Sequence, residues 1–403
     1  MRYSHPTQIS RSNFFASLEW TGERVVCKDV NVRGDTYPVA WADDGELYVG
    51  VGDPNCAVID GRFVTSVQMD AETKTKHYPA ICGMVVDKIS GSGENFSVSR
   101  VNDLPGFIGW GGHGPKPTGM VCVDGNLYMV AQNLLGWKPP RYGNNSQHGS
   151  DATVLKSTDK GKSWDPDLNS LLDDFQKEHF CKETWDWGTG PEQRGSFKDF
   201  KPMFPGSWFG GASFVQFGQN NGTAVDGYVY AVSSDHWDNG SDMRLGRVPK
   251  DKVLDIGSWE FAVTDDGGMD VSWVSNLYKS KPVLAIDRHV STPEMVYLPS
   301  AKKYLTVTWG LHTDFYATHG SELTVLESDN PWGPFRLVHY DWMWYKEEAG
   351  FYCPRIPLKW FDESTMTGHM LISGNWCTYE KYYLPQTMPF RLNLVADRTK
   401  NFW

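Results

Sequence analysis

Histidine, arginine and aromatic side chains gather in the glycine- and proline-rich segments that separate the apolar stretches of this chain. The histidines of these segments are His113, His148, His236, His289 and His312, and the arginines are Arg141, Arg244, Arg288 and Arg355. A guanidinium binds a carboxylate through two parallel hydrogen bonds, and histidine can accept a proton near neutral pH. These residue types favour removal of a proton from an acidic sugar followed by elimination, more than hydrolysis between paired carboxylates.

The candidates for proton transfer each have a structural alternative. His113 has glycines on both sides and His148 lies in a segment rich in glycine and asparagine, so each could approach a ligand or lie in solvent. Tyr228 and Tyr230 alternate along an apolar stretch, where packing in the core is the default, although a tyrosine hydroxyl can also protonate a leaving group. Arg244 opens a strand-like stretch and could bind a sugar carboxylate or lie in solvent.

A second set of residues could contact the substrate. Trp208 and Trp376 are suited to stacking on sugar rings, although any of the 18 tryptophans could belong to the core. His236 and His312 follow the ends of apolar stretches. Arg355, next to a cysteine and a proline, either grips the substrate or pairs with a carboxylate of the protein.

A repeated strand–turn–strand pattern predicts the elements that position these residues. The copies begin at Asp44, Asp124, Asp226, Lys302 and Thr367. Each follows an apolar stretch that is expected to form the first strand of the unit, and a third stretch usually comes after it. These first stretches are "YPVAWAD", "PTGMVCV", "ASFVQFG", "EMVYLPS" and "RIPLKWF". Repeated antiparallel sheets of this kind predict an all-β β-propeller, and a β-sandwich explains the regular blocks less well. Five units can be counted, and the regions 12–32 and 57–105 could hold two more.

Propeller geometry assigns the connecting segments to two faces. Segments before the first strand and after the second strand of each unit share one face, which holds the histidines and arginines above. The Asp-Gly turns lie on the other face. The stretch "KSTDKGKSW" has the spacing S-x-D-x-G-x-x-W, from Ser157 through Asp159 and Gly161 to Trp164. It resembles the Asp-box of sialidases, which predicts a structural turn on the face away from the site.

Composition narrows the classes of function. The 403-residue chain carries a net charge of −11, which argues against nucleic acid as a partner, and no apolar run is long enough to span a membrane. Its seven cysteines show no zinc-like spacing. We expect residues 1–403 to form one domain, with insertions around 134–147 and 165–205. We also expect a secreted monomer whose signal peptide is absent from this sequence.

Several motifs together resemble a known family. They are "KPTGMVCVDGNLYM", "KSTDKGKSW", "SFVQFGQNN", "VDGYVYAVSSD", "RLGRVPKDKV", "NPWGPF" and "YCPRIPLKW". Across residues 35 to 395 the chain is similar to β-propeller polysaccharide lyases, namely the ulvan lyases and the L-rhamnose-α-1,4-D-glucuronate lyases that act on gum arabic. The resemblance implies seven blades and cleavage of a rhamnosyl-α-1,4-glucuronate linkage by β-elimination, with an acidic polysaccharide as partner.

The same resemblance implies roles for individual residues. His113 matches the catalytic histidine and His148 a second histidine of the site, while Arg244 matches the arginine that binds the sugar carboxylate. The catalytic tyrosine is Tyr228 or Tyr230. The long insertions could enclose a deep pocket, which would favour release of terminal rhamnose.

Two other functions stay open. A propeller glycoside hydrolase, similar to sialidases or arabinanases, would use Asp35, Asp53 and Asp235 as its acid and base. A propeller without catalysis would bind glycans and release no product. Elimination requires no cofactor, because arginine can replace a cation, although a structural calcium ion is compatible with the sequence.

Elimination leaves a conjugated double bond that absorbs in the near ultraviolet. With gum arabic or ulvan as substrate, we expect absorbance to rise for the wild-type protein and to stay flat for His113→Ala. New reducing ends without absorbance would contradict the lyase interpretation and turn attention to the aspartates. Mixed oligosaccharides among the early products would contradict release of terminal rhamnose.

Overall fold

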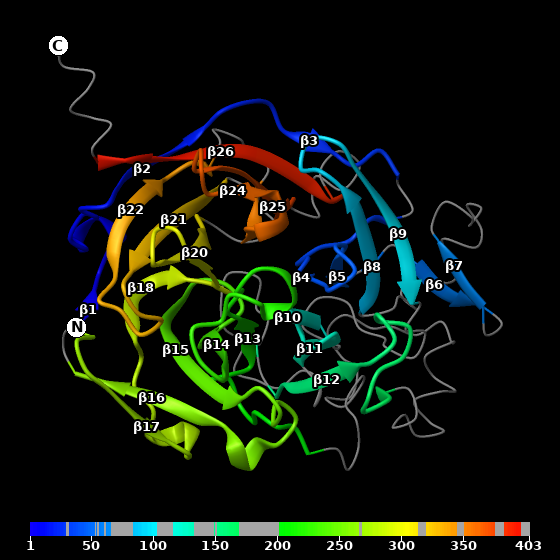
Figure 1. The fold of residues 1–403 in the computed structure, drawn as a ribbon, viewed down its shortest axis with the longest axis horizontal. Coiled ribbons are helices and arrows are strands. Elements are labelled where there is room, and N and C mark those ends of the chain that lie inside the picture. Colours follow the sequence, from blue (N-terminus) through cyan, green and yellow to red (C-terminus); the bar gives the residue numbers. More distant parts are fainter. Residues whose placement is uncertain are drawn as a thin grey trace.

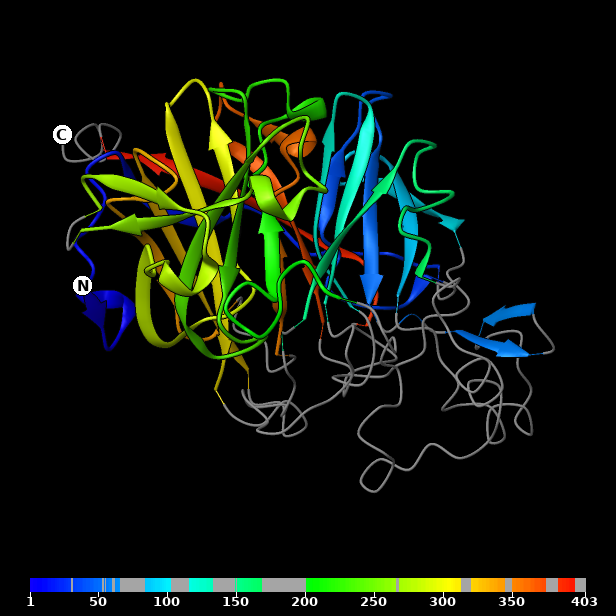
Figure 2. The same cartoon turned by 90° about the horizontal axis from the view of Figure 1, so that it is seen from below.

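The fold is all-β, with sheets arranged as a propeller ring around a central axis (Figure 1). The computed structural model describes residues 1–29, 32–52, 54, 56–59, 62–65, 84–102, 116–132, 149, 151–168, 201–265, 268–312, 320–344, 350–374 and 383–395. Five sheets of three or more strands form in these ranges, and each is a blade. The strands stand along the axis, as the side view shows (Figure 2).

The blades follow one another in chain order, each with its first strand innermost. Blade 1 contains β4 (Val39–Trp41), β5 (Leu47–Gly52), β8 (Met84–Gly91) and β9 (Phe96–Asn102). Blade 2 contains β10 (Lys116–Val123), β11 (Asn126–Gln132) and β12 (Thr153–Ser157). Blade 3 contains β13 (Gly211–Phe214), β14 (Tyr228–Ser234) and β15 (Gly240–Pro249), with β16 (Glu260–Thr264), β17 (Val271–Val274), β18 (Leu284–Val290) and β1 (Arg2–Tyr3) outside them.

The remaining blades complete the ring. Blade 4 contains β19 (Glu294–Leu298), β20 (Lys303–Leu311), β21 (Ser321–Ser328) and β22 (Arg336–Asp341). Blade 5 contains β23 (Tyr352–Arg355), β25 (Thr367–Ser373), β26 (Gln386–Leu394) and β2 (Phe15–Trp20), with the short β3 (Val25–Val26) and β24 (Phe361–Asp362). A separate hairpin joins β6 (Cys56–Ile59) to β7 (Arg62–Thr65).

The predicted hairpins are confirmed, and their turns repeat one side-chain contact. In blade 1 the Tyr48 hydroxyl donates to the Asp44 carboxylate at 2.8 Å, four residues back across the turn. In blade 3 the Tyr230 hydroxyl donates to Asp226 at 2.7 Å in the same way. Gly45 supplies the positive φ, 82°, that the first of these turns requires.

The core lies between neighbouring blades, because both faces of each sheet are covered. On β5, Leu47, Val49 and Val51 pack in a cluster that includes Leu371 of blade 5. Tyr48, which points to the other face of the same strand, packs in a cluster with residues of blade 2 such as Met120. Burial on both faces explains why these strands are apolar at nearly every position.

The blade count differs from the predicted seven. In the parts of the 57–105 and 12–32 regions that the structure describes, no extra blade forms. In the 57–105 region, β8 pairs with β5 and β9 pairs with β8, so both strands extend blade 1. In the 12–32 region, β2 and β3 pair with β26, so they complete blade 5. The second strand, β2, therefore closes the ring by pairing with β26, the last strand described.

The inner strand of blade 5 also differs from the prediction. The stretch "RIPLKWF" was expected to form it, but the strand is β23, which ends at Arg355. Pro357 precedes a 3-10 turn, Leu358–Trp360, and a proline has no N–H to donate to a sheet. Within the stretch, Arg355 at the end of β23 and Phe361 at the start of β24 pair with β25.

The S-x-D-x-G-x-x-W stretch forms the predicted structural turn. Asp159 accepts hydrogen bonds from the Ser157 hydroxyl at 2.8 Å and the Ser163 N–H at 2.9 Å. Gly161 has a φ of 85°. The Trp164 indole donates to the Gly161 carbonyl at 3.0 Å and packs in the core between blades 1 and 2.

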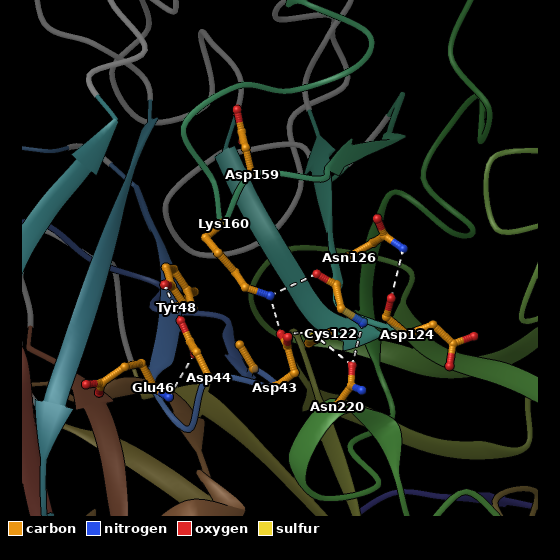
Figure 3. Close-up of polar contacts among 12 residues, drawn as sticks. Asp43, Asp44, Glu46, Tyr48, Cys122, Asp124, Asn126, Asp159, Lys160 and Asn220 are labelled. Atoms are coloured by element: carbon orange, nitrogen blue, oxygen red, sulfur yellow. Dashed lines mark hydrogen bonds and ion pairs between the residues drawn. The ribbon is translucent and has the colours of Figure 1, made fainter.

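This turn joins the Asp-Gly turns on one end of the ring, which we call the turn face (Figure 3). Lys160 donates to the Asp43 carboxylate of blade 1 and to the Gly125 carbonyl of blade 2 at 3.0 Å. The Asn220 side chain, from the connection within blade 3, accepts from the Gly125 N–H at 2.8 Å and the Cys122 thiol at 3.3 Å. Side chains of three blades thus meet at this end.

Some predictions fall partly or wholly outside the described residues. The insertion at 134–147 does, as does most of the insertion at 165–205. Among the described cysteines, Cys27, Cys122 and Cys353 are free thiols. A search of the described ranges for a helix with the length and apolar character of a membrane span finds none.

Ring closure through β2 leads to a stability prediction. Leu18 of β2 is 4% exposed and packs against residues of blades 4 and 5. Leu18→Ala should lower the free energy of unfolding by about 2–5 kcal/mol, because it removes buried contacts and leaves a cavity. Urea unfolding measures the change, with Ser17→Ala as the control on the same strand. Equal stability of the two variants would contradict a closing role for β2.

Candidate functional site

A buried arginine lies where the five blades meet on the axis. Arg355, at the end of β23, is 0% exposed. Its Nε donates to the Thr36 carbonyl of blade 1 at 3.2 Å, its Nη2 to the Thr118 carbonyl of blade 2 at 3.2 Å, and its Nη1 to the Ser213 hydroxyl of blade 3 at 3.3 Å. The next residue, Ile356, donates its N–H to Glu294 of blade 4. One residue and its neighbour thus contact every other blade.

An aspartate lies beside this arginine, before the inner strand of blade 1. The Asp35 carboxylate is 5% exposed and accepts hydrogen bonds from Tyr352 at 2.8 Å and Tyr383 at 3.1 Å. Its backbone pairs with Gly52 at the end of β5. This end of the ring, where the inner strands begin and the second strands end, is opposite to the Asp-Gly turns, and we call it the site face.

The backbone around Asp35 adopts uncommon conformations. Thr36 and Tyr37 have φ values of 65° and 38°, and Cys353, one residue after Tyr352, has a φ of 49°. A left-handed conformation is unfavourable for side chains such as threonine and tyrosine, and such residues cluster at functional sites. The Tyr37 hydroxyl donates to the Gly34 carbonyl at 2.6 Å, which helps hold the segment.

A second carboxyl group lies at the start of the blade 4 inner strand. Glu294 is 1% exposed. Burial raises the pKa of Glu294 to about 7, although the Arg355 charge and the Ile356 N–H oppose the rise. A carboxylic acid with such a pKa can hold a proton near neutral pH and release it.

The buried Cys353 thiol lies on the same strand as Arg355, β23. Burial raises the pKa of Cys353 to about 12, the Arg355 charge opposes this rise, and the charges of Asp35 and Glu294 add to it. An aromatic cluster borders the thiol, in which Trp309 and Tyr352 have ring centroids 5.6 Å apart. Acidic and aromatic side chains therefore surround Arg355.

The structure brings two of the predicted site residues together. The Arg244 guanidinium lies 4.0 Å from the centre of the Trp208 ring. Arg244 is 4% exposed, and burial lowers its pKa while Asp242, 3.6 Å away, opposes this change. Its Nε and Nη1 atoms are buried and have no hydrogen-bond partner. Two donors that remain unpaired and buried are costly unless a ligand occupies them.

The predicted tyrosines lie at the turn end of β14. Tyr230 donates to Asp226, as described above, and burial is the main cause that raises its pKa. Tyr228 packs under the Arg247 guanidinium, which is 4.2 Å from its ring centre. These contacts give both rings a structural partner on the turn face, so the proton-donor role implied by the family resemblance gains no support from their placement.

Other predicted residues lie on the site face in blades 3 and 4. Asp235 accepts the N–H groups of Ser241 and Asp242 at 2.9 and 3.1 Å, which ties its carboxylate to a turn. His236 follows it, and His312 follows β20 and stacks on Trp342. The residues His113, His148, Trp376 and Asp53 lie outside the described residues, and their roles stay predictions.

The sequence analysis did not identify Glu294 or the two tyrosines, Tyr352 and Tyr383, that donate to Asp35. Glu294 had a visible signal, because it is a lone acidic residue in the apolar stretch "EMVYL" that was expected to be an inner strand. Asp238 is another buried acidic residue that the sequence analysis did not select, and it is 0% exposed. It follows Trp237, whose ring centroid lies 5.6 Å from that of Tyr352. No pattern indicated that Tyr383 would reach Asp35, because they are 348 positions apart.

The side chains described here do not form a metal centre: within the described ranges, no three His, Cys, Asp or Glu residues gather at a suitable distance. The predicted structural calcium ion stays a prediction.

Comparisons with known proteins support the fold. No protein-family model and no curated protein matches the sequence. A solved protein of Bacteroides ovatus, provisionally named a hydrolase, is similar with a TM-score of 0.50 and 11% identity over 89% of this chain and 85% of its own. An α-L-arabinofuranosidase of Podospora anserina has a TM-score of 0.42 and 11% sequence identity, over 94% of this chain and 98% of its own. A xylan β-1,4-xylosidase of Bacillus halodurans has a TM-score of 0.46 and 11% sequence identity, over 91% of this chain and 56% of its own.

The raised pKa of Glu294 predicts a dependence of stability on pH. Between pH 4.5 and about 7 the folded chain keeps a proton that the unfolded chain has released. Stability therefore falls as the pH rises through this window, by up to about 3 kcal/mol from this group. Glu294→Gln should lose this component, as urea unfolding at several pH values would show. Parallel stability profiles for wild type and variant would contradict the assignment.

Proposed function

We propose that this chain is a propeller glycoside hydrolase whose catalytic groups are Asp35 and Glu294, at the axis on the site face. The observation that carries the proposal is a pair of buried carboxyl groups from blades 1 and 4 that accept hydrogen bonds from Tyr352 and Ile356, on the same blade 5 segment as Arg355. Hydrolysis of a glycosidic bond needs two such groups, one that protonates the leaving oxygen and one that activates water or attacks the sugar.

Glu294 is suited to the acid role. Its pKa of about 7 means that much of the group is protonated at neutral pH, as a general acid must be. When the acid releases its proton, the charge of Arg355 favours the resulting carboxylate, because this charge lowers the pKa of Glu294. The same arginine can thus support a proton donor and its charged product.

Asp35 is suited to the base role. The hydroxyl groups of Tyr352 and Tyr383 both donate to one oxygen, Oδ2, at 2.8 and 3.1 Å. Two donors from separate segments restrict the carboxylate to one orientation, which is how an active site preorganises a base. The backbone next to Asp35 is also constrained, because Thr36 has a left-handed conformation.

A specific observation favours an acidic glycan as a second candidate. Arg244 has buried N–H groups on Nε and Nη1 that lack a partner beside the Trp208 ring, and an oxygen of a sugar carboxylate could accept a hydrogen bond from either atom. This arrangement agrees with the glucuronate and the elimination chemistry expected from the family resemblance. In either case we propose that the partner is a polysaccharide and that the chain acts as a secreted monomer.

Substitution at the two carboxyl groups tests the hydrolase. On arabinan, xylan, gum arabic and ulvan, we expect new reducing ends from the wild-type protein and about a 10²–10⁴-fold lower rate for Asp35→Asn. Glu294→Gln should lose activity on these glycans but keep more of it on aryl glycosides with a good leaving group, because such substrates need no proton. Reducing-sugar and aryl-release assays measure both.

The control is Asp226→Asn, which changes an aspartate that accepts a tyrosine hydroxyl on the turn face. Its activity should equal that of the wild type. Full activity of Asp35→Asn would contradict the proposed catalytic role of Asp35. Near-ultraviolet absorbance without hydrolysis would indicate that the chain is a lyase and not a hydrolase.

A further inference from the structure

An aromatic pair stands at the edge of the site face. The rings of His312 and Trp342 stack, with centroids 3.7 Å apart and planes inclined by 14°. Even so, Trp342 is 56% exposed. Because the imidazole covers one face of the indole, the exposed area belongs mainly to the other face and the ring edge. The pair therefore presents a flat aromatic surface to solvent.

Strand direction places this pair on the site face. His312 follows the last residue of β20, and Trp342 follows the last residue of β22. Both strands run antiparallel to β21, so they end at the same end of blade 4. This is the end at which the inner strand of the blade begins with Glu294.

A rigid connection links the pair to the candidate catalytic groups. The Asn239 side chain of blade 3 forms two hydrogen bonds of 2.8 Å with the backbone of Leu311, the residue before His312. Leu311 is 6% exposed and belongs to the cluster that contains Tyr352. Tyr352 in turn donates to Asp35. The aromatic pair is thus held in a fixed position relative to the axis.

We propose that the stacked Trp342 and His312 form a distal subsite that binds one sugar ring of a glycan whose cleaved bond lies at the axis. The C–H face of a sugar ring packs against an aromatic ring, and tryptophan supplies the largest such surface. A ring already held by stacking loses little conformational freedom on binding. The inference rests on the proposed function for the identity of the ligand as a glycan.

Binding to a catalytically inactive protein tests this subsite separately from catalysis. In the Asp35→Asn chain, affinity electrophoresis through gels containing arabinan, xylan, gum arabic or ulvan should show retardation by at least one of them. Adding Trp342→Ala should weaken that binding about tenfold, a loss of about 1.4 kcal/mol. Trp342→Phe should retain most of it, which also shows that the position tolerates substitution.

The control is Val225→Ala, because Val225 is also apolar and 56% exposed but precedes the Asp226 turn on the opposite face. Its binding should not change. Equal weakening by both alanine variants, no effect of Trp342→Ala, or no retardation by any of the glycans would each overturn the subsite. A chain that binds through Trp342 yet releases no product in the wild-type form would keep the subsite and remove the hydrolase.

Discussion

The burial of one guanidinium sets the geometry of the whole site. Removing the Arg355 charge from water costs several kcal/mol, and only good hydrogen bonds together with nearby negative charge can offset such a cost. The backbone carbonyls of blades 1 and 2 and a hydroxyl of blade 3 accept its hydrogen bonds, and Glu294 of blade 4 adds a negative charge when it is ionised. Since each partner comes from a different blade, the arginine is satisfied only when the ring is complete. Folding of the ring and assembly of the site are therefore the same event.

The two ends of the ring differ in the contacts and the backbone conformations that they contain. On the turn face, Asp-Gly turns, Asp159 and Lys160 contact one another through short polar bonds that satisfy turn backbone and fix the blades in register. On the site face the side chains are buried carboxyl groups, and the chain adopts strained conformations at Thr36 and Cys353. The hydrogen-bonded turn face can stabilise the strained backbone of the site face, because the strands of each blade run from one face to the other.

The chemistry available at the axis is that of carboxyl groups, whereas the sequence drew attention to histidines. Asp35 and Glu294 accept hydrogen bonds from Tyr352 and Ile356, which lie close to Arg355 in the chain. The basic residue with unpaired donors, Arg244, lies beside Trp208 in a separate place. Hydrolysis at the axis and recognition of an acidic sugar nearby are compatible in one protein, because they use different side chains.

The sequence by itself determined the class of fold and the inner architecture of each blade. Period-two apolar stretches and Asp-Gly turns are local signals, so the hairpins, the S-x-D-x-G-x-x-W turn and the two faces were all predicted correctly. Which strands complete a blade is not a local property: β2 pairs with β26 across most of the chain, and this pairing changed the blade count. The candidate site is non-local for the same reason. Asp35, Glu294 and the strand Tyr352–Arg355 are far apart in the chain, and only closure of the ring makes them neighbours.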